Sequence, residues 1–364
     1  MPADRVTCRI GAMQAALRRG LVLVLSSLML VGMSGCSAAG YYWQAVTGHL
    51  DILQRTRPVP DWLAAPETAD TLRERLRLSQ RIRDFAVAEM KLPDNASYRS
   101  YADLGRPFVV WNLVAAPSDS LKLKTWCFVV VGCVSYRGYF AEADARAEAA
   151  ALAAQGWEVQ VYGVPAYSTL GWMNAFGGDP LLNTFLFHHE GDLARLIFHE
   201  LAHQVLYVAD DSSFNESFAT AVERLGVRRW LRTQASPATR VAYEAHEARR
   251  QQFRALTRQT RAELDALFVS RPPDLIARKA EIMARFRDRH ADLKASWGGF
   301  AGYDRWVAQA NNASLAGQGT YDDGVPAFEA LYERAGGDWS RFYDAVRALA
   351  EQPVAERRRF LKEP

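Results

Sequence analysis

The chain has 364 residues, of which 44 are Lys or Arg and 41 are Asp or Glu, and its formal net charge is +3 at pH 7. This balance excludes the concentrated basic surface that binding to nucleic-acid phosphates requires. The length exceeds that of a usual single core, so we expect one main domain with a large helical elaboration.

Residues 1–35 have the pattern of a targeting segment rather than of a folded element. Four arginines precede an apolar run, Leu21–Met33, that is short for a membrane-spanning helix. The sequence Met33-Ser34-Gly35-Cys36 then resembles the bacterial lipobox, in which the chain is cleaved before the cysteine and the cysteine is lipidated. This resemblance implies a lipoprotein signal peptide over 1–35 and a lipid on Cys36. An uncleaved anchor helix and a buried core helix are the alternatives.

A lipid on Cys36 would anchor the chain to a membrane on the periplasmic side of a bacterial envelope. Ser37 replaces the aspartate associated with inner-membrane retention, so the outer membrane is preferred. Cleavage would also remove four arginines and one aspartate, which leaves a formally neutral chain. In such an oxidising compartment we expect a disulfide between Cys127 and Cys133 that closes a small loop, with two buried free thiols as the alternative.

After a tether over residues 36–66, the patterns change from helical to strand-like. Apolar side chains recur at helical spacing along Glu67–Met90, which predicts an amphipathic helix. The alanine-rich segment Ala141–Gln155 predicts a second helix that ends at Gly156. Three segments around this helix are rich in β-branched and aromatic residues, which predicts strands at Phe108–Val114, Thr125–Tyr136 and Glu158–Val164.

The second half of the chain has mainly helical patterns. A short strand at Asn183–Phe187 is predicted to precede two helices, Leu193–Val208 and Asn215–Leu231. The charged segment 237–297 is interrupted by Arg271-Pro272-Pro273, which predicts a helical hairpin. Three further helices are expected at Ala327–Arg334, Trp339–Ala350 and Val354–Lys362. Together these patterns predict an α+β fold with a small β-sheet and a large helical C-terminal portion.

The predicted helix 193–208 carries His199-Glu200-Leu-Ala-His203, an H-E-x-x-H motif. Residues four apart project from one face of a helix, so the two imidazoles can hold one zinc ion. Glu200 projects in a neighbouring direction, where its carboxylate can take the proton of the attacking water as general base. The alternative is a surface helix with ordinary polar residues. An apolar stripe favours burial beside a site, and it consists of Leu193, Ile197, Leu201 and Val205.

A third candidate metal ligand, Glu216, lies thirteen positions beyond His203. Two histidines and one glutamate form a known catalytic zinc shell that leaves the fourth position for water. The alternative role of Glu216 is in a capping box, because Ser213-x-x-Glu216 fits S-x-x-E at a helix start. Glu223, seven residues further along the same helix face, is either an acceptor for a ligand histidine or a solvated surface residue.

The combination of HELAH and NESFA resembles the gluzincin peptidases, in which H-E-x-x-H and a downstream N-E-x-x-A helix share one zinc ion. The chain also resembles a bacterial family of predicted aminopeptidases over most of residues 36–364. The segments that carry this second resemblance are Ala166–Trp172, Asp179–Thr184, IFHELAHQ, FNESFATAVE, Trp126–Phe128, Gly132–Phe140 and Thr320–Asp322.

These resemblances imply a gluzincin-like zinc metallopeptidase domain over 67–364, with the helical hairpin around 237–297 as an insertion. The implied cofactor is one Zn²⁺ per chain, and the implied substrate is a peptide or protein. The gluzincin pattern assigns His199, His203 and Glu216 as metal ligands and Glu200 as general base.

A peptidase also needs a hydrogen-bond donor for the oxyanion that forms during attack. Tyr321 is the first candidate and Asn312 the second, with structural aromatic and turn roles as the alternative. Residues 167–169 are expected beside the cleft, and the strand Asn183–Phe187 is expected to pair with an extended peptide. The neighbouring His188 and His189 are expected at the surface or in packing, because consecutive strand residues face opposite ways. His246 and His290 are expected in solvent.

Three functions are compatible with these motifs. An envelope aminopeptidase is preferred, with Glu190 and Asp179 as candidate partners for the α-ammonium group of the substrate. An envelope metalloendopeptidase is the alternative if neither acid serves. A non-catalytic peptide-binding lipoprotein with a structural zinc is less favoured, because Glu200 is present and structural zinc sites usually have four protein ligands.

Overall fold

The computed structural model describes residues 40–128, 132–166, 177–318 and 324–362. The expected signal peptide, Cys36, Tyr321 and residues 167–169 lie outside these ranges. Contacts within the chain separate two compact units, Met1–Gln54 and Arg55–Pro364. Residues 40–55, which the sequence placed in a tether, are helical. None of the helices within the described ranges combines the length and apolar character needed to cross a membrane.

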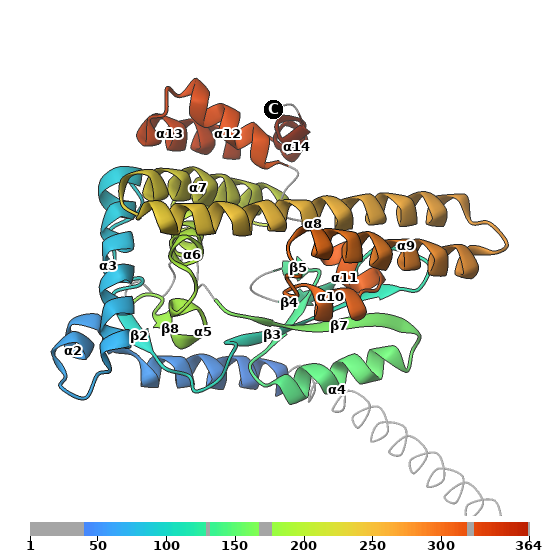
Figure 1. Cartoon of the computed structure of the whole chain (residues 1–364), viewed down its shortest axis with the longest axis horizontal. Coiled ribbons are helices and arrows are strands. Elements are labelled where there is room, and N and C mark those ends of the chain that lie inside the picture. Colours follow the sequence, from blue (N-terminus) through green and yellow to red (C-terminus); the bar gives the residue numbers. More distant parts are fainter. Residues whose placement is uncertain (1–39, 129–131, 167–176, 319–323, 363–364) are drawn as a thin grey trace, which may run out of the picture. The chain divides into compact units, whose positions relative to one another are not determined.

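In the described part of the second unit the strands form three small sheets (Figure 1). The first has the order β1-β2-β8, from Arg57–Pro58, Ser100–Ala102 and Leu181–Leu182, with β2 parallel to β8. The second is antiparallel with the order β6-β3-β7, from Arg137–Tyr139, Val110–Pro117 and Trp157–Val164. The third is a hairpin of β4 (Trp126–Phe128) and β5 (Gly132–Val134). Cys127 and Cys133 face each other across that hairpin, and the expected disulfide joins them.

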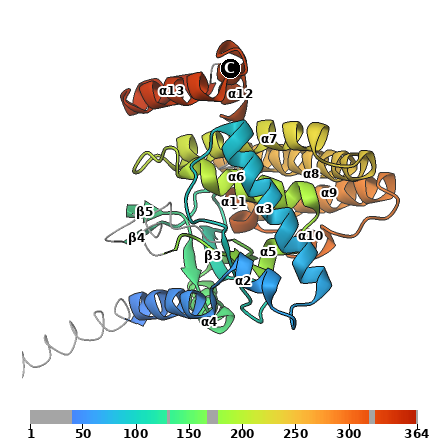
Figure 2. The ribbon, with the colours of Figure 1, turned by 90° about the vertical axis from the view of Figure 1, so that its left-hand side faces the viewer.

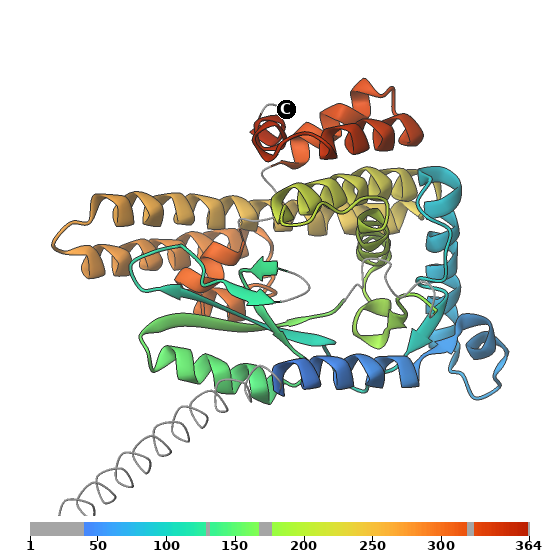
Figure 3. The same ribbon diagram turned by 180° about the vertical axis from the view of Figure 1, so that it is seen from behind.

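Strand β3 is buried along nearly its whole length because helices cover both faces of its sheet. Helix α4 (Glu142–Ala153) lies on one side, and α11 (Asn312–Gly317) lies on the other (Figures 1 and 3). On the α11 side, Ala313 packs against Val114 and Ala116. A strand covered on both faces has a nearly continuous apolar sequence, as β3 does apart from Asn112.

Helices α3 (Asp70–Met90), α6 (Glu190–His203) and α7 (Ser212–Thr233) pack together around an aromatic core (Figure 2). The Phe85 ring lies 6.0 Å from that of Phe198 and 5.2 Å from that of Trp230. Gly226 permits the close approach of these helices, because a Cβ atom there would lie 2.3 Å from Met90 Cε. This core fixes α6 against α7, the two helices that carry the motifs.

The predicted strand at Asn183–Phe187 is wrong. Pairing ends at Leu182, and α5 (Asn183–Leu186) is a short helix. The Asn183 side chain explains the change, because its Oδ1 accepts from Leu104 N and its Nδ2 donates to Arg106 O. These bonds turn the chain, and tertiary packing therefore overrides the strand propensity of the segment. The segment consequently offers no strand edge to a peptide.

Helices α8 (Pro237–Ser270) and α9 (Leu275–Ser296) form an antiparallel pair. Arg271 ends α8 in the left-handed conformation, at φ 44°, immediately before the two prolines that predicted the break. The remaining helices of this unit are α2 (Val59–Ala64), α10 (Asp304–Ala308), α12 (Val325–Arg334), α13 (Trp339–Ala350) and α14 (Val354–Lys362). Phe328 of α12 packs on Phe214 and Phe218 of α7. The predicted α+β class with a large helical portion is confirmed.

Candidate metal centre

Helix α6 presents His199 and His203 one turn apart, as the H-E-x-x-H spacing predicts. Its opposite face is fully buried through Leu193, Ile197 and Leu201. The helix ends at His203, earlier than the predicted end at Val208. The chain after His203 is therefore free to turn back toward α7.

Asn215 holds this turn in place. Its Oδ1 accepts from Val208 N at 2.8 Å, and its Nδ2 donates to Val208 O at 2.7 Å. Asn215 is almost completely buried, so this paired bond fixes the approach of the α6–α7 loop to the first turn of α7. Sequence reasoning gave Asn215 no role, although it directly precedes Glu216 in the NESFA segment.

The first turn of α7 is capped by Asp211, whose Oδ1 accepts from Phe214 N. Ser213 lies inside the helix, so the capping-box alternative for Glu216 does not apply. Asp211 also forms a buried ion pair with Arg357, at 2.7 Å. Glu216 is thereby left to point across from α7 to the two histidines of α6.

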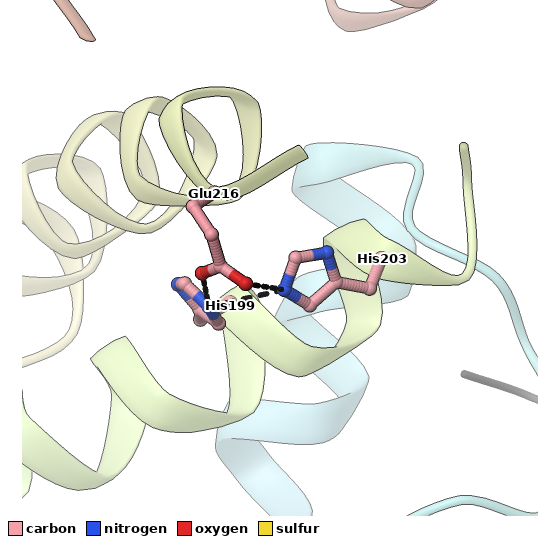
Figure 4. Close-up of side chains that lie close together, drawn as sticks. All are labelled: His199, His203 and Glu216. Carbon is pink, nitrogen blue, oxygen red and sulfur yellow. Dashed lines mark hydrogen bonds and ion pairs between the residues drawn. The ribbon is translucent and has the colours of Figure 1, made fainter. Parts of the chain in front are cut away.

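The three side chains His199, His203 and Glu216 converge on one point (Figure 4). The two Nε2 atoms lie 3.2 Å apart, and Glu216 Oε2 lies 3.3 Å from His199 Nε2. Glu216 Oε1 lies 3.8 Å from His203 Nε2. Tetrahedral zinc with ligand distances of about 2.0–2.1 Å would separate two ligand atoms by roughly 3.3–3.4 Å. The donor set and its spacing therefore fit a tetrahedral metal ion.

The electrostatics of the metal-free site also match a place for a cation. Burial opposes the charge of His199, but hydrogen bonds to Glu216 and Glu223 outweigh it and raise the pKa of His199 well above its ordinary value. Burial and the neighbouring His199 lower the pKa of His203 to about 4. Two carboxylates, Glu216 and Glu223, therefore face His199 and favour a positive charge there, as they would favour a bound metal ion.

Glu223 lies directly behind His199. Its side chain is 5% exposed, and its Oε2 accepts the Nδ1 hydrogen of His199 at 3.0 Å. This bond leaves His199 Nε2 to face Glu216, which is the orientation a metal-ligating histidine needs. Arg195, one turn before His199 on α6, donates from Nε to Glu223 Oε1 at 2.6 Å. Glu223 is therefore a buried, fully engaged carboxylate rather than a solvated one.

A cavity of about 740 Å³ opens beside these residues, within the usual size range of ligand sites. Its lining includes His199, Glu200 and the end of strand β7 at Val164. His188 and His189, expected at the surface or in packing, line it as well, and so does His246, which was expected in solvent. His290 lies elsewhere and is buried against Phe253, so its expected position in solvent is wrong. His246 reaches the cavity because the first half of α8 packs beside α6, a long-range contact that the sequence pattern does not reveal.

The other sequence candidates lie elsewhere. Asn312 is fully buried against β3, where its Nδ2 donates to Pro117 O and Ser120 O, so both amide hydrogens are used. Glu190 accepts from Trp230 Nε1 at 2.9 Å. Asp179 is 2% exposed. The structure thus gathers the predicted ligands, Glu200 and Glu223 in one place, and it gives Asn312 and Glu190 other partners.

A family model described as "Putative aminopeptidase" matches residues 40–361, which is most of the chain. No curated protein and no solved structure matches this chain.

Proposed function

Because the chain belongs to the family described as "Putative aminopeptidase", a family that implies a hydrolase of peptides or proteins, we propose that it is a zinc-dependent aminopeptidase. The observation that carries the proposal is the convergence of His199, His203 and Glu216 at tetrahedral spacing beside a cavity that Glu200 lines. Three protein ligands leave one position for a water or a substrate, as in catalytic zinc sites.

His199, His203 and Glu216 would hold the metal ion. When bound, zinc lowers the pKa of a coordinated water to about 7 and polarises a carbonyl group. Glu223 keeps the Nδ1 hydrogen of His199 in a hydrogen bond and thereby presents Nε2 to the ion. Replacement of any of these four residues is expected to act on the reaction by weakening metal binding.

Glu200 would act as the general base. It follows His199 on α6 and is one of the residues that line the cavity, in which a substrate carbonyl would lie. There it takes a proton from the attacking water and passes it to the leaving amine. A positioned acid–base group of this kind contributes about 10²–10⁴-fold to the rate.

An endopeptidase is the second candidate, and the acidic residues of the cavity favour it. An aminopeptidase needs a carboxylate for the substrate's α-ammonium group. Besides Glu200, the described residues that line the cavity include Asp192 and Glu223, and arginines already pair with both of these acids. Since Glu190 and Asp179 are also engaged or buried, the ammonium partner is not evident among the described residues.

For localisation we propose a lipid anchor at Cys36 on the periplasmic side of a bacterial envelope, in the outer membrane by preference. The support is the sequence alone, through Met33-Ser34-Gly35-Cys36 and the arginines that precede it. Radioactive palmitate incorporation in cells tests the anchor. Labelled wild type and unlabelled Cys36→Ser are expected, and equal labelling of the two would exclude lipid attachment at Cys36.

Hydrolysis of a matched peptide pair tests the function. The purified chain is supplied with zinc and with peptides that differ only in a free or an acetylated amino terminus. An aminopeptidase releases the first residue of the free peptide and leaves the acetylated one intact, whereas an endopeptidase cuts both at an internal bond. Glu200→Gln serves as the inactive control, and activity in that variant equal to wild type would contradict the proposal.

A further inference from the structure

We propose that Arg195 is a positioning residue for the metal centre, which it serves by holding the Glu223 carboxylate against His199 and by linking that carboxylate to helix α8. The inference rests on the proposed zinc site and assigns a role to a residue that lines the cavity but is not one of the three metal ligands. The contacts run from His199 of α6 to Glu223 of α7, and from there back to Arg195 of α6. Arg195 then contacts Glu247 of α8.

The contacts in this chain are short and largely buried. His199 Nδ1 lies 3.0 Å from Glu223 Oε2. Arg195 approaches the other oxygen of the same carboxylate, with Nε at 2.6 Å and the second guanidinium nitrogen at 2.5 Å from Oε1. The Glu223 side chain is only 5% exposed, and that of Arg195 is 18% exposed. Each carboxylate oxygen therefore has its own partner, and the carboxylate cannot rotate without breaking one of these bonds.

This arrangement gives Arg195 a specific effect on His199. Both guanidinium nitrogens hold Oε1 while His199 holds Oε2, so the plane of the carboxylate is fixed by partners at its two oxygens. With the plane of Glu223 fixed, Oε2 stays aligned with His199 Nδ1, and the ring presents Nε2 toward Glu216. Without Arg195, Glu223 Oε1 would be buried without its partner, and the carboxylate would be expected to reorient toward solvent. The His199 ring would then lose its fixed orientation.

Helix α8 also contacts Arg195, through an acidic residue. Glu247 of α8 lies 3.7 Å from Arg195, and it also pairs with Arg250 at 3.0 Å. Arg250 in turn pairs with Asp192 in the first turn of α6, at 2.6 Å. Helix α8 is therefore bound to α6 at two points one turn apart, and Arg195 is the group through which this attachment reaches the metal centre.

Zinc affinity tests the role of Arg195 directly. The metal-free chain is titrated with zinc in competition with a chromogenic chelator, for wild type, Arg195→Gln and Arg195→Lys. Residues that orient a metal ligand typically contribute 10–100-fold to affinity, so Arg195→Gln is expected to bind zinc about tenfold more weakly. Arg195→Lys retains the charge but not the paired contact, and we expect its affinity to lie between those of the other two chains.

Lys279→Gln is the matched control. It breaks another partly buried ion pair, that of Lys279 on α9 with Glu158 on β7, whose side chains are 13% and 24% exposed, and neither residue belongs to α6 or α7. Its zinc affinity is expected to equal that of wild type. Cobalt-substituted samples give a second measurement, because visible absorption bands respond to ligand geometry. These bands are expected to shift in Arg195→Gln but not in Lys279→Gln.

The outcomes separate this inference from the proposed function. A wild type that binds no zinc would overturn the proposed function. A wild type that binds zinc, together with an Arg195→Gln variant of equal affinity, would overturn only the role of Arg195. Equal losses in Arg195→Gln and Lys279→Gln would also overturn it, because they would indicate general destabilisation. If circular dichroism shows that Arg195→Gln is unfolded, Arg195→Lys carries the test, and wild-type affinity in that variant would reject the inference.

Discussion

Glu223→Gln should destabilise the metal-free protein in a pH-dependent way. The substitution keeps the shape of the side chain but removes its negative charge. Burial alone would raise the pKa of Glu223, but Arg195 and His199 outweigh it and lower that pKa from an ordinary 4.5 to about 2. The glutamine variant therefore leaves the buried Arg195 guanidinium with Glu247, at 3.7 Å, as its remaining acidic partner.

The size and sign of the effect follow from the shifted pKa. A carboxyl group whose folded pKa is depressed stabilises the fold above its unfolded pKa, and this stabilisation is lost as the pH falls toward the folded pKa. A shift of about 2.5 pH units corresponds to about 3 kcal/mol of unfolding free energy at pH 7. This value agrees with the cost of about 3–5 kcal/mol for breaking a buried ion pair. At pH 3 the difference between the two chains should shrink to about 1 kcal/mol.

Urea unfolding at pH 7 and pH 3, followed by circular dichroism in the presence of a chelator, measures this difference. Glu263→Gln is the control, because Glu263 pairs with Arg285 and Arg289 in a more exposed position, where the expected cost is about 0–1 kcal/mol. If Glu223→Gln costs no more than this control at pH 7, or if its cost is the same at both pH values, the account of Glu223 as a charged, buried partner is refuted.

Three further predictions concern the site and its supports. Glu200→Gln should lower kcat by about 10²–10⁴-fold with unchanged zinc content, measured by peptide hydrolysis and metal analysis; normal turnover would reject the general-base role. Gly191→Ala should cost about 1–3 kcal/mol in urea unfolding, because its Cβ would lie 2.3 Å from the Tyr243 ring, whereas Gly317→Ala, with open space around it, should cost far less. Zinc affinity should rise about tenfold per pH unit from pH 6 to 7.5, because the raised pKa of His199 makes zinc displace a proton; a flat profile in the competition titration would contradict this.

The parts of the site that follow from local periodicity could be predicted from the sequence. His199 and His203 share a helix face because of their spacing. Of the expected apolar stripe, Leu193, Ile197 and Leu201 are buried, whereas Val205 follows the end of α6 and is only half-buried. Glu216 could be proposed as a third ligand because it lies near the start of the next helix. Its approach to the histidines additionally needs the Asn215 bonds to Val208, which a spacing argument does not contain.

Features that depend on contacts distant in sequence could not be predicted in this way. The strand expected at Asn183–Phe187 is helical because its first side chain bonds to a loop almost 80 residues earlier. Asn312 looked like a free amide in a polar loop, but packing of α11 on β3 buries it. The contacts of Arg195 with Glu247, and the place of His246 in the cavity, likewise arise only from the position of α8 beside α6.

Metal analysis of the purified chain tests the central claim most directly. After exposure to zinc and removal of the unbound metal, wild type is expected to retain one zinc ion per chain, and Glu216→Ala is expected to retain much less under the same conditions. A wild type without zinc, or a Glu216→Ala variant that retains the metal as well as wild type does, would contradict the claim that His199, His203 and Glu216 form the zinc site.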